Sequence, residues 1–568
     1  MRKATRLRKT GVLLALLLST LATSQVPVQG EHGMVASASR IASEIGVQVL
    51  KRGGNAVDAA CAVGLALAVV YPEAGNIGGG GFMMVRLANG KSVAIDYRET
   101  APAGASRTMY LDPSGTVIPQ DSLVGYRASG VPGTVAGFAL AQRKYGKLKW
   151  RDVVEPARAL AANGFILSKA FADNVRRARN LAQFPESKRI FQNNGSYYKE
   201  GDLFRQPDLG ETLKRIEDQG PSEFYRGKTA QLIASAMSGK GMITLKDLAN
   251  YKAVERKPVE GTYRGYQVIT MPPPSSGGIA VIEMLNMLEK YPMAKLGFDT
   301  PESDHLVVEA MRRAFADRSE FLGDPDFVKI PQRELLSKAY AQKVGSNIDP
   351  QKASLSSQVG HGNPAGYESS ETTHFSVVDA AGNAVSNTYT LNFGYGSGVT
   401  IPGAGFLMND EMDDFTSKPG VPNGFGLIQG EFNAIGPNRR PLSSMTPTFL
   451  VKDSKLAMVI GSPGGPTIIT TVLQVILNVV DHGMNIAEAI AAPRLHHQWL
   501  PDEIQAETGS APGATYTSLM SMGHVFTSNA RGPRVHWGDA EGIAIDLKTG
   551  LRYGASDPRS SNAAAVGY

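Results

Sequence analysis

Thr372 and Thr390 are the residues of this sequence whose spacing most clearly brings two reactive groups together. The alternating segment 373–378 is followed by the turn-forming run Asp-Ala-Ala-Gly-Asn and by a second alternating segment, 384–390, which predicts a β-hairpin. A turn centred near Ala381 sets the two threonines opposite one another, with their Cβ atoms within ~5.5 Å. A threonine hydroxyl is a weak nucleophile until a base takes its proton, so this pair is a candidate centre for nucleophilic chemistry.

A glycine-rich turn, Ser462-Pro-Gly-Gly-Pro466, is a candidate site for binding an oxyanion. It lies between a predicted strand that ends near Gly461 and a predicted helix that starts near Thr467. Unpaired N–H groups at a helix start point outward, and glycine lets a ligand approach them closely. Turns of this kind are also common for purely structural reasons, so the motif alone does not establish a site.

A further set of charged and hydroxyl side chains is dispersed along the chain. Such side chains are most often solvated charges and turn hydroxyls. Their spacing along the sequence does not predict that they converge. The set consists of Arg98, Glu411, Asp413, Asp414, Ser443 and Ser444.

Nucleotide and metal chemistry are disfavoured. The segment Gly75–Gly81 leads into a predicted strand and is not followed by Lys-Ser/Thr, so it matches neither a P-loop nor a dinucleotide-binding motif, and close backbone packing is favoured. The single cysteine, Cys61, lies in an apolar segment and is interpreted as a buried thiol. His496–His497 lacks the i, i+4 spacing of helical metal ligands. The sequence therefore predicts no metal and no cofactor.

Helices and strands in mixed order are expected to position these residues, which indicates an α+β fold with layered packing. A hairpin over 82–87 and 92–97 sets Arg98 at a strand end. The region of about 130–350 is expected to be mixed helices, and 350–371 to be loop. The other predicted elements are helices over 39–52, 55–70, 467–481 and 485–492 and strands over 448–451 and 456–460.

Charge and composition argue against a nucleic-acid partner. The 568 residues are 42% hydrophobic and 19% charged, with a formal net charge of +6. Residues 1–24 contribute five of these positive charges and no acidic residue, which leaves +1 for the rest. The main body of the protein is thus close to neutral, and it has no basic block of the kind that binds nucleic acid.

The N-terminus resembles a secretory signal peptide. The basic stretch is followed by the apolar run Val12–Leu21 and by small residues that allow a cut after Ser24. The run is shorter than the ~20 residues needed to span a bilayer. The protein is therefore expected to be exported, with no membrane span once residues 1–24 are removed. A single cysteine allows no internal disulfide.

The segment Thr372-Thr-His-Phe-Ser-Val-Val-Asp379 resembles the start of the small subunit of γ-glutamyltranspeptidases, and Tyr389-Thr-Leu-Asn392 resembles their next strand. The resemblance runs from about Gly33 to the C-terminus, and it is strongest to the bacterial periplasmic members. The other matching motifs occur in the order of the family: Asn55-Ala-Val-Asp-Ala-Ala60, Gly75–Phe82, Asp96-Tyr-Arg-Glu-Thr-Ala-Pro102, Met412-Asp-Asp-Phe415, Pro441-Leu-Ser-Ser-Met445, Gly461-Ser-Pro-Gly-Gly465 and Gly554-Ala-Ser-Asp-Pro-Arg559.

This resemblance implies a four-layer αββα sandwich of the N-terminal-nucleophile hydrolase type. A precursor would be cut between Glu371 and Thr372 into a large subunit, 25–371, and a small subunit, 372–568, which form one intertwined domain as a heterodimer. Thr372 would then attack glutathione or another γ-glutamyl compound, with its new α-amine as the base and Thr390 as the orienting hydroxyl. Water, an amino acid or a dipeptide would release the acyl group.

The resemblance also assigns residues to the parts of the substrate. Each part of a γ-glutamyl group calls for its own partners, namely cations and hydroxyl donors for the α-carboxylate, acceptors for the α-ammonium and N–H donors for the oxyanion. The assigned residues are Arg98, Ser443 and Ser444 for the carboxylate, Asn392, Glu411 and Asp414 for the ammonium, and Gly464 and Gly465 for the oxyanion.

One departure from the family concerns the lid over the pocket. Many bacterial relatives carry a tyrosine there, whereas the matching segment Pro422-Asn-Gly-Phe-Gly426 offers Phe425. Phenylalanine cannot hydrogen-bond across to Asn392. The hypothesis is a looser lid and a shifted balance between hydrolysis and transfer, and an unchanged product ratio in Phe425→Tyr would contradict it.

Three alternatives remain. A glutaryl or cephalosporin amide acylase would share the fold, but its substrates need not carry an α-ammonium, so Asp414 favours the glutamyl interpretation. An inactive periplasmic glutathione-binding protein would need neither Thr372 nor Thr390. An exported nucleotide-binding protein would lack a phosphate-binding lysine motif.

Overall fold

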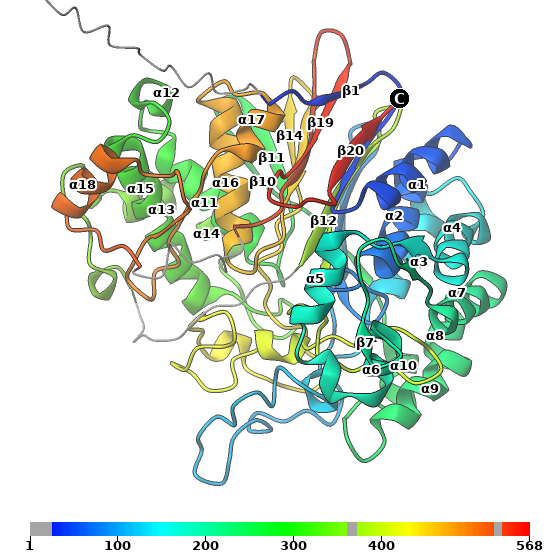
Figure 1. The fold of residues 1–568 in the computed structure, drawn as a ribbon. Coiled ribbons are helices and arrows are strands. Elements are labelled where there is room, and N and C mark those ends of the chain that lie inside the picture. Colours follow the sequence, from blue (N-terminus) through cyan, green and yellow to red (C-terminus); the bar gives the residue numbers. More distant parts are fainter. Residues whose placement is uncertain (1–24, 361–371, 528–536) are drawn as a thin grey trace, which may run out of the picture.

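Two β-sheets stand face to face between two groups of helices in the computed structural model (Figure 1), which describes residues 25–360, 372–527 and 537–568. The predicted signal segment 1–24 and Glu371 lie outside the described residues. In the part of the chain that is described, no helix is both long enough and apolar enough to cross a membrane.

Sheet 1 has seven strands, and each pairs antiparallel with its neighbours. In spatial order the strands are β1 (Val28–Gly30), β19 (Arg552–Ser556), β18 (Glu541–Ile545), β15 (Lys455–Gly461), β14 (Thr448–Lys452), β11 (Tyr266–Thr270) and β10 (Val259–Tyr263).

Sheet 2 also has seven antiparallel strands. Its β12–β13 hairpin pairs Thr373 with Tyr389, so Thr372 and Thr390 form the next opposed pair, as predicted. In spatial order the strands are β20 (Ala564–Gly567), β2 (Met34–Ser37), β12 (Thr373–Val378), β13 (Ala384–Thr390), β3 (Gly80–Arg86), β4 (Ser92–Tyr97) and β9 (Val254–Arg256).

Helices cover the outer face of each sheet. On sheet 2 lie α1 (Arg40–Lys51) and α2 (Ala56–Val70), with α3 (Thr134–Tyr145), α4 (Trp150–Asn163) and α7 (Pro207–Gln219) packed around them. On sheet 1 lie α11 (Gly277–Leu288), α16 (Thr467–Val480) and α17 (Ile486–Ala491), with α13 (Pro301–Phe321) and α15 (Lys338–Gly345) outside α11. These layers confirm the predicted αββα sandwich.

Shorter elements fill the periphery. The remaining helices are α5 (Lys169–Arg177), α6 (Pro185–Phe191), α8 (Ser222–Arg226), α9 (Lys228–Met237), α10 (Leu245–Asn250), α12 (Met293–Leu296), α14 (Gln332–Leu335) and α18 (Gly513–Ser521). The two-stranded sheets are β5 (Phe165–Ile166) with β8 (Leu203–Phe204), β6 (Gln192–Asn193) with β7 (Ser196–Tyr197), and β16 (Leu495–His496) with β17 (Gln505–Ala506).

The inner faces of the two sheets enclose an apolar core. Phe82 and Met84 of sheet 2 belong to the same buried cluster as Phe449 and Ile543 of sheet 1. Alternate side chains of each strand point inward, which is why short alternating segments such as 373–378 form central strands here. This packing fixes the two sheets relative to one another and thereby the loops at their ends.

Helix α2 is buried along its whole length. The Asn55 side chain accepts hydrogen bonds from the N–H groups of Val57 and Asp58, and the Asp58 side chain accepts one from the N–H of Asn55, which is a capping box. Cys61 lies inside this helix, and its burial raises the pKa of the thiol. The interpretation of 55–70 as a buried helix with a structural cysteine is confirmed.

The expectation of mixed helices over about 130–350 was incomplete, because β9, β10 and β11 lie in that region. Strands β10 and β11 form a hairpin in which Tyr263 pairs with Tyr266 around Arg264 and Gly265. Each strand has five residues, so the alternation of period two is too short to stand out between longer helices.

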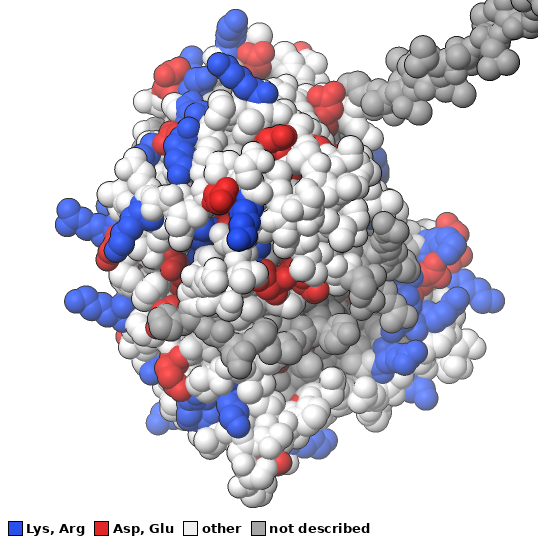
Figure 2. All heavy atoms as spheres, turned by 90° about the vertical axis from the view of Figure 1, so that its left-hand side faces the viewer, with Lys and Arg blue, Asp and Glu red and all other residues white. Residues whose placement is uncertain are grey.

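Charges of both signs are interspersed over uncharged surface on the face of the molecule seen in Figure 2. Proteins that bind nucleic acid usually gather their basic side chains on one face or along one stripe. The expectation that this chain has no nucleic-acid partner stays a prediction.

Candidate active site

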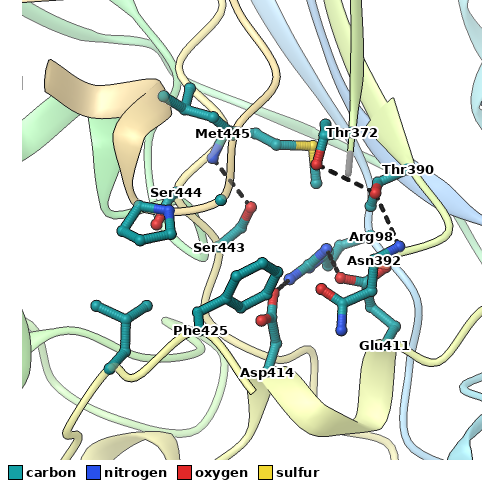
Figure 3. Close-up of a pocket in the computed structure, with 14 residues that line it drawn as sticks. Arg98, Thr372, Thr390, Asn392, Glu411, Asp414, Phe425, Ser443, Ser444 and Met445 are labelled. Atoms are coloured by element: carbon teal, nitrogen blue, oxygen red, sulfur yellow. Dashed lines mark hydrogen bonds and ion pairs between the residues drawn. The ribbon is translucent and has the colours of Figure 1, made fainter. Parts of the chain in front are cut away.

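The two threonine hydroxyls meet at the end of the β12–β13 hairpin (Figure 3). Thr372 Oγ1 and Thr390 Oγ1 are 3.2 Å apart. The backbone N–H of Asn392 donates to Thr390 Oγ1 at 2.8 Å, which holds the Thr390 hydroxyl in place. Both threonines are buried, with 6% and 2% of their surface exposed.

No histidine, carboxylate or amine in the described part of the chain hydrogen-bonds the Thr372 hydroxyl. His374 is the nearest candidate in sequence, but its ring nitrogens contact the hydroxyls of Thr388 at 2.8 Å and Ser376 at 3.1 Å. Burial lowers the pKa of His374 to about 3, so it is neutral. A base for Thr372 must therefore come from outside these side chains.

The glycine segment 75–81 supports the hairpin by close backbone packing. A Cβ atom on Gly79 would lie 1.9 Å from the carbonyl oxygen of Thr390, and one on Gly80 would lie 2.6 Å from Glu99 Oε2. Only glycine allows this approach. The packing interpretation of the segment is confirmed, and it bears directly on the position of Thr390.

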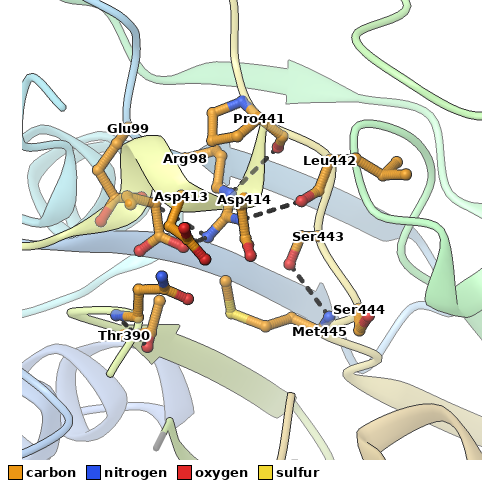
Figure 4. A network of polar contacts seen from close by, with 12 residues as sticks. Arg98, Glu99, Thr390, Asp413, Asp414, Pro441, Leu442, Ser443, Ser444 and Met445 are labelled. Carbon is orange, nitrogen blue, oxygen red and sulfur yellow. Dashed lines mark hydrogen bonds and ion pairs between the residues drawn. The ribbon is translucent and has the colours of Figure 1, made fainter. Parts of the chain in front are cut away.

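A buried ionic network lies beside the threonines (Figure 4). Arg98 follows the last residue of β4 and is fully buried. Its Nη1 donates to Glu411 and its Nη2 to Asp414, and both carboxylates belong to the short 3-10 helix Glu411–Asp414. Its guanidinium also donates to the carbonyl oxygens of Pro441 and Leu442, each at 3.2 Å. These residues converge, although their sequence spacing did not predict it.

The network holds more carboxyl groups than guanidinium groups. Burial raises the pKa of Glu411 and of Asp414, while Arg98 lowers both. Glu99, which the sequence analysis did not single out, lies 3.9 Å from Arg98 Nη1, and both oxygens of its buried carboxyl group lack a hydrogen-bond partner among the described residues. Burial raises the pKa of Glu99 to about 7, against the effect of Arg98. A buried carboxyl group with a raised pKa keeps its proton to a higher pH than an exposed one.

The two serines each have a hydroxyl proton to offer a ligand. The Met445 N–H donates to Ser443 Oγ at 3.1 Å, and Arg318 Nη2 donates to Ser444 Oγ at 3.2 Å. Both partners are donors, so each serine oxygen accepts, and neither serine hydroxyl donates to another described residue. The two hydroxyls can therefore donate to an anion in the pocket.

Arg318 of α13 is a second buried cation behind the pocket. This residue was not identified from the sequence. It is 2% exposed, donates to Ser276 Oγ at 2.9 Å, and has no carboxylate within ion-pair distance among the described residues. Burial lowers its pKa to about 10, while Asp414 raises it. Nothing in the sequence sets this arginine apart from the other charges of its helix.

The turn between β15 and α16 offers two unpaired N–H groups. Gly464 and Gly465 have φ of +129° and +53°, values that favour glycine. Within the described ranges neither N–H donates a hydrogen bond. The Gly464 carbonyl accepts from the N–H and hydroxyl of Thr467 at 3.0 and 2.7 Å, which fixes the turn. This geometry suits an oxyanion hole.

Phe425 covers the pocket on the side of the glycine turn. Its ring stacks on Phe393, with centroids 4.5 Å apart and planes at 15°, and a Cβ atom on Gly465 would lie 2.7 Å from it. Phe425 is 4% exposed. The amide of Asn392 donates instead to the carbonyl of Asp410 at 3.1 Å. The sequence did not suggest this stack, and both the lid role of Phe425 and the looser lid stay predictions.

One pocket collects the predicted residues from six separate parts of the chain. Gly464 adjoins this pocket without lining it, and Glu371 lies outside the described residues. The lining comprises Arg98, Thr372, Thr390, Asn392, Glu411, Asp414, Phe425, Ser443, Ser444 and Gly465, together with Leu427, Met445, Pro466 and Ile468.

Elsewhere in the described residues, His305, Glu309 and His524 are spaced closely enough to hold a metal ion. Glu309, however, forms ion pairs with both Arg312 and Arg313. Two guanidinium groups beside the only carboxylate of the trio oppose binding of a cation. The expectation of no metal and no cofactor stays a prediction.

A family model and curated relatives place the chain in one family. The family model Gamma-glutamyltranspeptidase matches residues 42–567. The chain is 51% identical over 548 residues to a glutathione hydrolase proenzyme of Escherichia coli (strain K12), covering 95% of this chain and 93% of the relative.

The similar solved structures include an acylase as well as a γ-glutamyltranspeptidase. A cephalosporin acylase from Bacillus halodurans matches with a TM-score of 0.82 at 26% identity, covering 98% of this chain and 99% of that chain. The γ-glutamyltranspeptidase of Helicobacter pylori is 48% identical with a TM-score of 0.56, covering 56% of this chain and 93% of that one.

Proposed function

This chain belongs to the γ-glutamyltranspeptidase family and acts as a γ-glutamyltransferase and glutathione hydrolase, and we propose that Thr372 is its nucleophile. The observation that carries this proposal is the 3.2 Å contact between the hydroxyls of Thr372 and Thr390 in a pocket that also holds Arg98 and Asp414. Acyl transfer from a γ-glutamyl donor needs a nucleophile close to side chains that bind the α-carboxylate and the α-ammonium of the donor.

The base follows from how the nucleophile is made. No basic side chain in the described part of the chain reaches the Thr372 hydroxyl, whereas cutting the Glu371–Thr372 bond creates an α-amine on the same residue. An α-amine has a pKa of ~7.7–8.0, so a useful fraction is unprotonated at neutral pH. It takes the hydroxyl proton as the oxygen attacks the γ-carbonyl, and it later returns the proton to the leaving amine.

Donor binding exchanges partners within the ionic network. Arg98 already pairs with Glu411 and Asp414, so an α-carboxylate that reaches Arg98 releases a carboxylate for the α-ammonium. The exchange keeps every buried charge paired, and so avoids the free-energy cost of an unpaired charge in the pocket. The hydroxyls of Ser443 and Ser444 donate to the same α-carboxylate, and Asn392 adds an amide to the ammonium side.

The glycine turn completes the reaction centre. Attack by Thr372 puts negative charge on the carbonyl oxygen, and the free N–H groups of Gly464 and Gly465 are the donors proposed to stabilise it. One donor of this kind is worth about 3–4 kcal/mol in enzymes where it has been removed. Water then releases glutamate, or the amine of an amino acid or dipeptide acceptor takes the acyl group.

We propose the precursor is divided into a large subunit, 25–371, and a small subunit, 372–568. Both sheets are shared across that division, since β12 and β13 lie between β2 and β3, and β11 lies between β10 and β14. The two chains should therefore stay together after the cut as a heterodimer. Residues 1–24 are proposed to direct export to the periplasm or medium, so the mature large subunit should begin at Gln25.

The pH dependence of kcat tests the proposed base. The α-amine accepts a proton only when it is unprotonated, so kcat at saturating donor should rise with pH and level off above ~8. Pre-steady-state acylation rates measured from pH 6 to 9 follow this step directly. A rate that falls as pH rises through this range would rule out an amine base.

The acylase alternative is tested by comparing a γ-glutamyl anilide with a glutaryl anilide, which lacks the α-ammonium. Asp414 and Glu411 both line the pocket, so the γ-glutamyl compound should have the lower KM. Asp414→Asn should raise that KM by about 10- to 150-fold, the range for a hydrogen bond to a charged group, and change the glutaryl KM much less. Equal effects on both substrates would favour the acylase.

An inactive binding protein is the remaining alternative. It is disfavoured because a protein that only binds glutathione would have no need of the paired hydroxyls of Thr372 and Thr390. Binding of glutathione without any release of glutamate would support it.

A further inference from the structure

Asp413 lies between the two carboxylates of the pocket in sequence but does not line the pocket itself. Its side chain is 4% exposed and accepts two hydrogen bonds from separate segments. Oδ1 accepts from the hydroxyl of Ser122, and Oδ2 accepts from the backbone N–H of Gly424, each at 2.7 Å. Figure 4 shows Asp413 beside Asp414. None of the steps described so far uses this carboxylate.

The segment that Asp413 holds is the one that carries Phe425. Asn423 Oδ1 accepts from the N–H groups of Phe425 and Leu427 at 3.0 and 3.2 Å, so residues 423–427 form a self-braced turn. A Cβ atom on Gly424 would lie 2.7 Å from Asp413 Oδ2. The carboxylate therefore binds the backbone of the turn at a point where only glycine permits the approach, one residue before the ring that covers Thr372.

The other partner, Ser122, belongs to the long connection between β4 and the 3-10 helix Tyr126–Ala128. This connection also contacts the lid region through Lys418 Nζ, which donates to the Gly115 carbonyl at 2.8 Å, and through Arg107, which donates to the Thr416 and Ser417 carbonyls at 3.2 and 3.1 Å. Asp413 thus links this connection, through Ser122, to the turn 423–427 that carries Phe425.

We propose that Asp413 is a positioning residue that tethers the turn 423–427 to Ser122 and so keeps Phe425 closed over the acyl-enzyme. The catalytic consequence rests on the function proposed above. A closed ring against Gly465 limits the entry of water to the ester, whereas an acceptor is admitted by specific binding. Loosening the tether should therefore raise the share of acyl groups lost to hydrolysis.

The charges around Asp413 suit this role above mildly acidic pH. Asp410, Asp414 and Tyr110 are the ionisable groups that interact with it. Burial raises the pKa of Asp413 to about 6, against the two hydrogen bonds that lower it. The carboxylate accepts from both segments when ionised, so the tether is intact above about pH 6 and weakens as the pH falls below it.

The test uses the processed enzyme with Ser122→Ala, Asp413→Asn and the matched control Ser122→Thr, which keeps a hydroxyl. Ser122→Ala should speed amide hydrogen exchange in 423–427 by about 2- to 13-fold, as expected for one lost hydrogen bond. The ratio of hydrolysis to transfer, measured with a γ-glutamyl anilide and a dipeptide acceptor, should rise in step. Asp413→Asn should raise the exchange rate and the ratio of hydrolysis to transfer more than Ser122→Ala does. Ser122→Thr should give the wild-type values of both.

The two readouts separate this inference from the proposed function. Unchanged exchange in Ser122→Ala would overturn the tether, and faster exchange with an unchanged product ratio would overturn its catalytic role. If Asp413→Asn does not fold, Ser122→Ala and Ser122→Thr still decide the question. A wild-type enzyme that turns over no γ-glutamyl anilide would instead contradict the proposed function, while the exchange rates would still test the tether.

Discussion

Replacement of Thr372 by alanine should leave the precursor as one chain and reduce γ-glutamyl turnover by about 10⁴- to 10⁶-fold, the range for removal of a covalent nucleophile. The physical reason is that one hydroxyl is proposed to do both steps. It is the nearest hydroxyl to the scissile bond before the cut and the attacking group afterwards. Denaturing electrophoresis and release of an anilide from a γ-glutamyl anilide measure the two effects.

Thr372→Ser is the matched control, since it keeps the hydroxyl and loses a methyl group. It should process and turn over donor, with lower rates because serine is less restricted at χ1 than threonine. A Thr372→Ala protein that is cut and active would contradict the assignment. A Thr372→Ser protein that is well folded but fully inert would do so as well.

Replacement of Arg98 by methionine should raise the KM for the γ-glutamyl donor by about 30-fold or more, as expected when one partner of a buried charge pair is removed. It should also destabilise the protein by about 3–5 kcal/mol. Arg98 is fully buried between Glu411 and Asp414, so its loss leaves those carboxylates without their ion-pair partner. Donor KM and the thermal unfolding midpoint measure the two effects.

Arg98→Lys separates charge from geometry. Lysine keeps the positive charge but lacks the planar guanidinium. Its single ammonium group cannot contact the Pro441 and Leu442 carbonyls and both carboxylates at once. It should recover most of the stability and only part of the donor affinity. An Arg98→Met protein with a normal donor KM would show that the α-carboxylate binds elsewhere, and Arg318 behind Ser444 would then be the next cation to test.

The β12–β13 hairpin could be predicted from sequence because its determinants are local. A turn of five residues sets the register, and the register alone opposes Thr372 and Thr390, as the pairing of Thr373 with Tyr389 confirms. The glycine turn at 462–466 was likewise predictable, because a strand, a turn and a helix follow one another along the chain.

The ionic network could not be predicted in this way. Arg98 meets Glu411 and Asp414 across 313 and 316 residues of sequence, and only the assembled sheets bring them together. The family resemblance named these residues without their geometry. It did not show that Arg98 is paired with both carboxylates, the observation behind the proposed exchange of partners on donor binding.

Glu99, Arg318 and Asp413 illustrate a second limit. Each is a charged residue of a type that is usually solvated, and only burial gives it a role. Glu99 is next to Arg98 in the sequence, and Asp413 is next to Asp414. Their position beside assigned site residues could have indicated both. Arg318 lies within a helix of mixed charge, where no pattern in one sequence distinguishes it.

The most direct test of the central claim is the mass of each chain after the processed enzyme is quenched in denaturant during turnover of a γ-glutamyl anilide. The account predicts two chains, the smaller one starting at Thr372 and carrying one γ-glutamyl group on that residue. A γ-glutamyl group on any other residue would contradict it. So would a single uncut chain that turns over the donor.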